Sequence, residues 1–211
     1  LARLEREAAD AKLHAMQAQI EPHFLFNTLA SIDQLIRTDP QRASQVQKTL
    51  IQYLRAAIPQ MRDDAQRSTL GRQVSMSHAY LEIMQVRMEE RLAFSFDVPE
   101  GILCAEFPSM MLQTLIENSI KHGLEPKTEG GRIDVSAEVA RGKLRVRVVD
   151  TGAGCAADAR DGVGLSNIRE RLRLLYGDSA TLTLSANETG GTIAVIEIPY
   201  HDDEGQQAKT C

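Results

Sequence analysis

Hydrophobic residues recur at three- and four-residue intervals through the first sixty positions, which is the spacing of amphipathic helices. Pro40 interrupts the pattern within TDPQ, so we expect two helices joined by a short turn. Such a pair leaves apolar faces uncovered, and pairing of two copies into a dimeric four-helix bundle would bury them. The expected core positions are Leu25, Leu29, Ile32 and Ile36 in the first helix, and Ala43, Val46, Leu50, Tyr53, Leu54 and Ala57 in the second.

From Leu70 onward, helical periodicity alternates with the two-residue periodicity of strands. The predicted strands outnumber the helices and several form hairpins, which indicates a mixed sheet covered by helices, an α/β sandwich. The fold class expected for the whole chain is therefore α+β. We expect helices over 70–92, 108–123 and 162–177, and strands over 92–98, 132–139, 143–150, 180–186 and 192–200.

These patterns divide the chain into four parts. Residues 1–60 form the helical pair, polar residues 61–69 a linker, residues 70–200 the mixed domain, and residues 201–211 a tail expected to be disordered. The chain begins with Leu rather than Met, so we expect it to be a fragment.

Composition narrows the class of protein only slightly. The chain has 211 residues, 43% hydrophobic and 25% charged, with a formal net charge of −5. This charge argues against direct binding of nucleic acid or anionic membrane, which favour basic surfaces. No apolar run is long enough to cross a membrane, so any membrane anchor is expected in a missing upstream segment.

His23 is the first candidate for chemistry. On a helical wheel it lies opposite the expected core face, on a stripe that continues through Asn27, and it follows Pro22, which should bend the helix. Phe24 and Phe26 flank it. Taken alone, this stretch fits a solvated, inert histidine somewhat better than a reactive one.

A second candidate is the helix ending in LIENSIKHG. Asn118, Lys121 and His122 share one α-helical face. An amide oxygen suits Mg²⁺, which keeps waters and phosphate oxygens as its other ligands. The alternative is that this is an ordinary polar helix end.

Two glycine motifs follow. In DTGAG, Asp150 ends a predicted strand and could accept a hydrogen bond from an exocyclic amine, while Gly152 and Gly154 allow close backbone approach. In GVGLSN, Gly162 and Gly164 precede a helix, whose N-terminal N–H groups can bind phosphate. A tight turn is the alternative for the first motif, and a lone GxG is weak evidence for the second.

The order of these motifs resembles that of a known family. QIEPHFLFNTLASI, LIENSIKHG, VVDTGAG and GVGLSNIRERLRLLYG are similar to the histidine box and ATPase boxes of LytS/YehU-like sensor histidine kinases. The resemblance covers roughly residues 12–200. It implies a GHKL-type (Bergerat) ATP-binding domain after a dimerisation and phosphotransfer hairpin.

The resemblance assigns roles to residues. It implies that ATP and Mg²⁺ are bound, that His23 accepts the phosphoryl group, and that Asn118 is the Mg²⁺ ligand. The residues it places around ATP are Asn118, Lys121, His122, Asp150, Gly152, Gly154, Gly162, Gly164, Leu165 and Thr192.

The identity of a catalytic base stays open. Many histidine kinases carry an acid directly after the histidine, where this chain has Phe24. Glu21 is a candidate base. Asn27 could hydrogen-bond the imidazole or assist hydrolysis of a partner's phospho-Asp. Glu117 could activate water, as an acid there does in hydrolytic relatives.

The expected function is that of a sensor histidine kinase core in a two-component system, the cytoplasmic portion of an inner-membrane-anchored protein. Its expected partners are a second copy of itself and the receiver domain of a response regulator, by family analogy of the LytTR type. The alternatives are a GHKL-type ATPase or serine kinase regulator, and a degenerate kinase that acts as a signalling scaffold.

Overall fold

The computed structural model describes residues 22–62, 68–154 and 162–200. Its α-helices and strands alternate in the second half, as the sequence predicts. The α-helices are α2 (Pro22–Thr38), α3 (Pro40–Arg62), α4 (Leu70–Met88), α5 (Met111–Asn118) and α6 (Val163–Tyr176). The strands are β1 (Ser68–Thr69), β2 (Leu92–Asp97), β3 (Glu106–Phe107), β4 (Gly131–Ala140), β5 (Lys143–Asp150), β6 (Thr181–Ala186) and β7 (Thr192–Pro199). Short helical turns η1 (Glu89–Arg91), η2 (Glu100–Ile102), η3 (Ser119–Leu124, π-helical) and η4 (Gly177–Ser179) complete them.

Five strands form one mixed sheet in the order β2-β4-β5-β7-β6. β2 runs parallel to β4, and the other neighbours are antiparallel. The β4–β5 hairpin turns at Arg141 and Gly142, both with positive φ, which is the geometry that matches the twist of the flanking strands. The expected α+β class and mixed sheet are confirmed.

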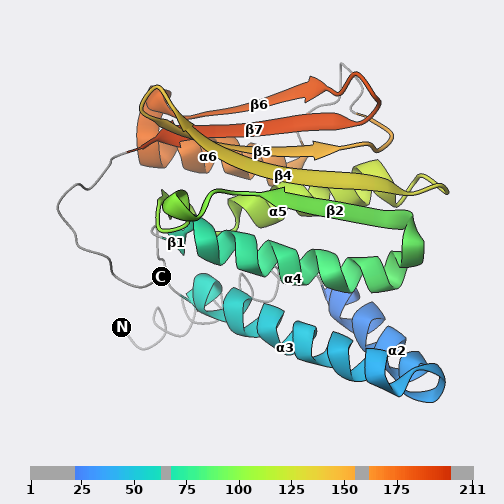
Figure 1. The fold of residues 1–211 in the computed structure, drawn as a ribbon. Helices are drawn as coiled ribbons and strands as arrows, with labels where there is room; N and C mark the ends of the chain where they lie inside the picture. Colours follow the sequence, from blue (N-terminus) through green and yellow to red (C-terminus); the bar gives the residue numbers. More distant parts are fainter. Residues whose placement is uncertain (1–21, 63–67, 155–161, 201–211) are drawn as a thin grey trace, which may run out of the picture.

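The helices form two layers on the sheet. Figure 1 shows α4 between the sheet and the pair formed by α2 and α3. α4 therefore buries residues on both of its sides, among them Leu70, Met76, Tyr80, Ile83 and Met88. One continuous hydrophobic core extends through the helical pair, α4 and the sheet. The predicted domain boundary at 61–69 stays a prediction.

The break between the two N-terminal helices lies where Pro40 predicts it. Asp39 precedes α3, and its Oδ1 accepts a hydrogen bond from the N–H of Arg42 at 3.0 Å. Pro40 occupies the first position of α3, where a missing N–H costs nothing. This is the usual capping chemistry of a helix start. The predicted bend at Pro22 falls at the edge of the described residues, because α2 begins there.

The predicted core face of α3 is confirmed, whereas the predicted face of α2 is only partly buried within the single chain. In α2 the buried residues are Phe24, Thr28 and Ile32, whereas Leu29 and Ile36 are 54% and 57% exposed. The reason is that α3 and α4 contact α2 from the side of Phe24, rather than from the side of the leucine stripe. The aliphatic stripe of α2 therefore stays on the surface of the single chain.

No helix in the described part of the chain is long and apolar enough to span a membrane.

Candidate active site

Asp150 is the best-defined polar group of the site. It ends β5, is 3% exposed, and its carboxylate is held by three donors. Oδ1 accepts the N–H groups of Gly152 at 2.9 Å and Thr192 at 3.1 Å, and Oδ2 accepts the hydroxyl of Ser119 at 3.0 Å. Hydrogen bonds of this kind compensate the cost of burying a charged group. The carboxylate is thereby fixed at the end of the strand.

The backbone around Asp150 is packed too closely for side chains. A Cβ built on Gly152 would lie 2.4 Å from the Cα of Gly123, and the N–H of Ala153 donates to the Gly123 carbonyl at 2.9 Å. Gly123 belongs to the π-helical turn η3. π-helical turns are rare in proteins, and those that occur are often found at functional sites. The turn is therefore consistent with a ligand site here.

The glycine turn before β7, at Gly190 and Gly191, packs against the end of β5 at Asp150. Gly191 has φ +95°, and a Cβ there would lie 2.0 Å from the Asp150 carbonyl oxygen. The same oxygen accepts the side-chain amide of Asn187 at 3.2 Å. Gly154 lies near Gly191, with 3.6 Å between its Cβ position and the Gly191 carbonyl oxygen. The predicted adenine-side residues, Thr192 among them, therefore gather around Asp150.

Asn118 ends α5 and faces the start of α6. A Cβ on Gly164 would lie 3.1 Å from Cγ2 of Thr114 and 3.4 Å from Nδ2 of Asn118. This Nδ2 atom is buried and has no hydrogen-bond partner among the described residues. The Asn118 amide is therefore not committed to a protein partner through this atom.

This arrangement fits the expected magnesium ion. Mg²⁺ needs few protein ligands, because waters and substrate phosphates complete its octahedron. A single amide oxygen at Asn118 suits that role. Among the described residues, no group of three or more His, Cys, Asp or Glu side chains is gathered as a metal site.

The N-terminus of α6 is the expected phosphate site. Gly162 caps the helix without any side-chain hydrogen bond, is exposed, and has no atom within 4 Å of a Cβ position. Leu165 is half-buried against the core. A helix of this length concentrates partial positive charge at its first N–H groups, which favours anions. The preceding residues 155–161 lie outside the described part.

Lys121 and His122 are placed differently from expectation. The prediction put them on one α-helical face with Asn118, but α5 ends at Asn118 and they lie in the wider π-helical turn. The three- and four-residue spacing of an α-helix does not apply there, so the shared face with Asn118 stays a prediction. Both side chains are exposed at the surface beside the site.

His23 is exposed on α2, as predicted. The amide nitrogen of Asn27, one turn later, lies 3.1 Å from Nδ1 and 3.2 Å from Nε2 of the imidazole. The neighbouring Phe24, expected to flank it on the surface, is instead buried between Tyr53 of α3 and Tyr80 of α4, with ring centroids at 5.5 and 5.0 Å. The histidine helix is thus anchored to the sheet-bearing part of the molecule. Glu21, the candidate base, lies outside the described residues.

Glu117 is half-buried and belongs to a network that sequence reasoning missed. Its Oε1 accepts the amide of Gln113 at 2.9 Å, and Gln113 in turn accepts the hydroxyl of Ser77 at 3.4 Å. Burial raises the pKa of Tyr53, and the Glu117 carboxylate raises it further. The four-residue spacing of Gln113 and Glu117 is visible in the sequence, but the partner on α4 is not.

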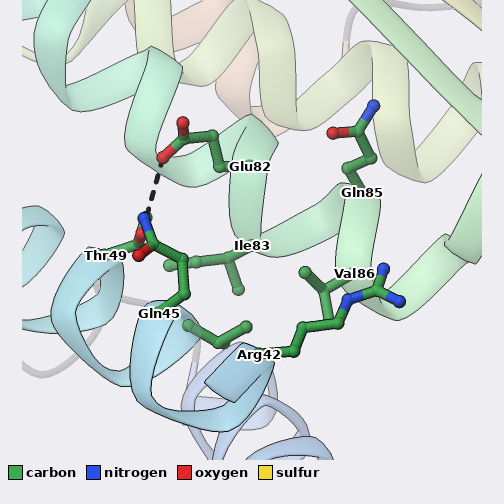
Figure 2. Close-up of a pocket in the computed structure, with 8 residues that line it drawn as sticks. Arg42, Gln45, Thr49, Glu82, Ile83, Gln85 and Val86 are labelled. Carbon is green, nitrogen blue, oxygen red and sulfur yellow. Dashed lines mark hydrogen bonds between the residues drawn. The ribbon is translucent and has the colours of Figure 1, made fainter. Parts of the chain in front are cut away.

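A separate hollow of about 230 Å³ lies between α3 and α4. Figure 2 shows Thr49 and Glu82 pointing toward each other across it, with Oγ1 and Oε2 3.5 Å apart. None of the predicted nucleotide-binding residues lines this hollow. It therefore lies at the interface between α3 and α4, apart from the candidate nucleotide site. Its lining residues are Arg42, Gln45, Val46, Thr49, Glu82, Ile83, Gln85 and Val86.

Two family models match consecutive parts of the chain. The model described as histidine kinase matches residues 11–92, and the one described as histidine kinase-, DNA gyrase B- and HSP90-like ATPase matches residues 105–202. The second match contains Asp150, Asn118 and the glycines around them.

Curated relatives agree with this assignment. Over 92% of this chain, the sequence is 34% identical to sensor histidine kinase YesM of Bacillus subtilis. Over 90% of this chain, it is 34% identical to sensor histidine kinase YpdA of Escherichia coli. It is 30% identical to sensor protein LytS of Enterococcus faecalis over 92%. The chain spans about a third of the length of these relatives, 34% to 35%.

Solved structures share the fold. Acinetobacter baumannii histidine kinase AdeS superposes with a TM-score of 0.52 over 92% of this chain and 98% of that one, at 16% identity. The catalytic domain of histidine kinase ThkA gives 0.51 over 63% and 95%, at 20% identity. With two family models in the expected order and sensor kinases among its relatives, the chain belongs to the histidine kinase family, as its four motifs indicate.

Proposed function

We propose that this chain is the catalytic core of an ATP-dependent protein-histidine kinase, which phosphorylates its own His23 and passes the phosphoryl group to an aspartate of a response regulator. The observation that carries the proposal is the gathering of Asp150, Asn118 and Gly164 at one place in a molecule that also holds an exposed His23. Phe24 packs the histidine helix against α4, and α4 in turn contacts α5, which carries Asn118.

Asp150 binds the adenine ring of ATP in this proposal. Its carboxylate, already oriented by two backbone N–H groups, accepts the exocyclic amine. Gly152, Gly154 and Thr192 shape the surrounding pocket, because the backbone there presents no bulky side chain to a planar base.

The phosphates lie between α5 and α6. Asn118 supplies an oxygen to Mg²⁺, which when bound neutralises phosphate charge. The N-terminal N–H groups of α6, at Gly164 and Leu165, take phosphate oxygens, and Gly162 caps the same helix end. Lys121 and His122, both exposed just after Asn118, can donate hydrogen bonds to phosphate oxygens, and Lys121 adds positive charge.

His23 then attacks the γ-phosphorus with the lone pair of a ring nitrogen. A nitrogen–phosphorus bond forms, the bond from the γ-phosphorus to the β–γ bridging oxygen breaks, ADP leaves with that electron pair, and the proton on the other ring nitrogen passes to solvent. Asn27 Nδ2 can donate only to the ring nitrogen that keeps its lone pair, so this hydrogen bond holds the resting imidazole and opens before that nitrogen attacks. Glu21 lies two residues before His23, and Glu117 directly precedes Asn118, so these two acids remain the candidate bases. Correct positioning of His23 and the γ-phosphate supplies most of the rate acceleration.

The surface of the helical pair suits a second copy of the chain. Leu29 and Ile36 on α2, and Ile51 and Ile58 on α3, are exposed at seven-residue spacing, so each helix presents an apolar stripe that a partner can cover. A four-helix bundle would cover them. The receiver domain of a response regulator, including regulators of the LytTR type, is the proposed acceptor. We propose no direct binding of nucleic acid, and a cytoplasmic position anchored through an upstream membrane segment.

Incubation of the chain with Mg²⁺ and ATP labelled in the γ-phosphate tests the proposal. We expect protein-bound label that is stable in alkali and lost in acid, as a phosphoramidate is. Label that survives acid would favour the serine kinase alternative. ATP hydrolysis without protein-bound label would favour the ATPase alternative, and no reaction at all would favour the scaffold.

A further inference from the structure

An arginine of α6 holds the segment that begins α5. Arg171 lies in the third turn of α6, and its two terminal nitrogens donate to Ser109, one to the carbonyl oxygen at 3.0 Å and the other to Oγ at 2.9 Å. Ser109 is 3% exposed and Arg171 is half-buried, so both bonds are largely shielded from water. Because a guanidinium is planar and rigid, two parallel bonds fix the direction of the contact as well as its length.

The segment that Arg171 holds has a strained backbone. Met110 directly follows Ser109 and has φ +65°, a left-handed conformation that is uncommon for residues with a side chain. Its carbonyl oxygen accepts the N–H of Thr114 at 2.9 Å and the Thr114 hydroxyl at 2.8 Å. Such a conformation persists only where the surrounding structure holds it. Arg171 and Thr114 hold it from opposite sides, so Arg171 supports the first turn of α5.

The two helices meet again at the expected phosphate site. Gly164 lies seven residues before Arg171, which is about two turns, so the two residues share the side of α6 that faces α5. The Cβ position of Gly164 is 3.1 Å from Thr114 Cγ2 and 3.4 Å from Asn118 Nδ2. Thus α6 contacts α5 at both ends, about 10 Å apart along the α6 axis. The Arg171 guanidinium is bound at the end of α5 that lies away from Asn118, so it affects the phosphate site through the position of α6.

We propose that Arg171 is a positioning residue for the phosphates of ATP: by joining α6 to the start of α5, it keeps the N-terminal N–H groups of α6 beside Asn118. The inference rests on the proposed function. Loss of the Arg171–Ser109 contact weakens the binding of phosphate. The adenine contacts stay intact, because Asp150 is held by its own neighbours in the sheet and in the adjoining turns.

Arg171→Met tests this role with two probes. Methionine is also long and unbranched but cannot donate a hydrogen bond. Titration calorimetry with Mg²⁺ gives the Kd of a nonhydrolysable ATP analogue, and ligand-observed NMR gives that of adenosine, which has no phosphate. Affinity for the ATP analogue should fall about tenfold, as for a lost hydrogen bond to a charged group. Adenosine affinity should change less than about twofold, within the scatter of independent effects. General destabilisation would weaken both alike.

Two further variants separate the hydrogen bonds of Arg171 from its charge. Arg171→Lys keeps the charge but not the two parallel donors, so affinity for the ATP analogue should still fall at least about threefold. Arg173→Met is the matched control, because it removes the same charge from an exposed position on the same helix. It should leave both affinities within about twofold of the wild type. A long-range attraction between Arg171 and the phosphates would instead leave Arg171→Lys unaffected.

Ser109→Ala completes a double-variant cycle, because it removes one of the two acceptors. Alone, it should lower affinity for the ATP analogue about threefold. In the Arg171→Met background it should lower that affinity less, because both changes break the same contact.

The inference is overturned if Arg171→Met or Arg171→Lys binds the ATP analogue as the wild type does, if adenosine affinity falls as far, if Arg173→Met loses as much, or if the effects of Arg171→Met and Ser109→Ala multiply. If Arg171→Met does not fold, Arg171→Lys and Ser109→Ala decide the question. Weaker binding of the ATP analogue with unchanged adenosine binding supports the role, and wild-type binding by either variant refutes it. A wild-type chain that binds neither probe would instead refute the proposed function itself.

Discussion

Gly164 lies against the side-chain amide of Asn118, with 3.4 Å between its Cβ position and Nδ2. The contact joins the second residue of α6 to the last residue of α5, which are far apart in the sequence. Two residues assigned to the phosphate end of ATP from separate motifs therefore meet in space.

This contact predicts unequal effects for two neighbouring glycines. Gly164→Ala places a methyl group 3.1 Å from Thr114 and against Asn118, so α6 or the amide must move. We expect nucleotide affinity to fall about tenfold, which corresponds to about 1.4 kcal/mol. Gly162→Ala meets no atom within 4 Å and has negative φ, so it should lower affinity less than Gly164→Ala does. Titration calorimetry with a nonhydrolysable ATP analogue measures both; equal effects would contradict the assignment.

Asp150→Asn should separate stability from nucleotide binding. The asparagine oxygen can keep the two backbone N–H groups, and its nitrogen can donate to the Ser119 hydroxyl, which then accepts. We expect a stability loss of only about 1–2 kcal/mol in urea unfolding. Nucleotide affinity should fall by at least about tenfold, because an NH₂ donor replaces one of the two carboxylate oxygens that can accept the adenine amine. Unchanged affinity would exclude Asp150 from the adenine site.

The two phenylalanines beside His23 should behave differently. Phe24→Ala leaves a cavity between Tyr53 and Tyr80 and should cost about 3–5 kcal/mol of unfolding free energy. Phe26 is 73% exposed, so Phe26→Ala should change stability by less than about 0.5 kcal/mol in dilute, monomeric protein. Chemical denaturation of both variants checks this. A comparable loss for Phe26→Ala would mean that α2 packs in another orientation.

Dimerisation through the helical pair predicts a charge-sensitive surface. Ile36→Glu puts a charge into the exposed aliphatic stripe of α2, and burying it in a bundle would be costly. Light scattering should then show a monomer at micromolar concentrations where the wild-type chain is a dimer. Gln34→Glu, an exposed polar position on the same helix, is the control and should remain dimeric. A dimer that survives Ile36→Glu would place the interface elsewhere.

Much of the fold could be predicted from local pattern. The strand pattern gives β5 at 143–150 directly, and the proline and glycine positions mark the ends of α3 and α6 to within a few residues. These signals depend on neighbouring residues only, so the sequence carries them in full. Asp150 could be placed at a strand end for the same reason.

The errors came from contacts between distant elements. The buried side of α2 depends on α3 and α4, and a helical wheel with hydrophobic residues on several sides does not specify it. Phe24 could not be assigned to the core without knowing that Tyr53 and Tyr80 lie beside it. The π-helical turn after Asn118 contains Gly123, which lies against Gly152, and no local pattern encodes this long-range contact.

The most direct measurement maps the phosphoryl group to a residue. The chain is incubated with Mg²⁺ and ATP, quenched in alkali to preserve phosphoramidates, and analysed by fragmentation mass spectrometry. Our account predicts one modification, on His23, and none in His23→Gln, although that variant binds the nucleotide analogue as the wild type does. Equal modification of His23→Gln, or a phosphoryl group on any other residue, would contradict it.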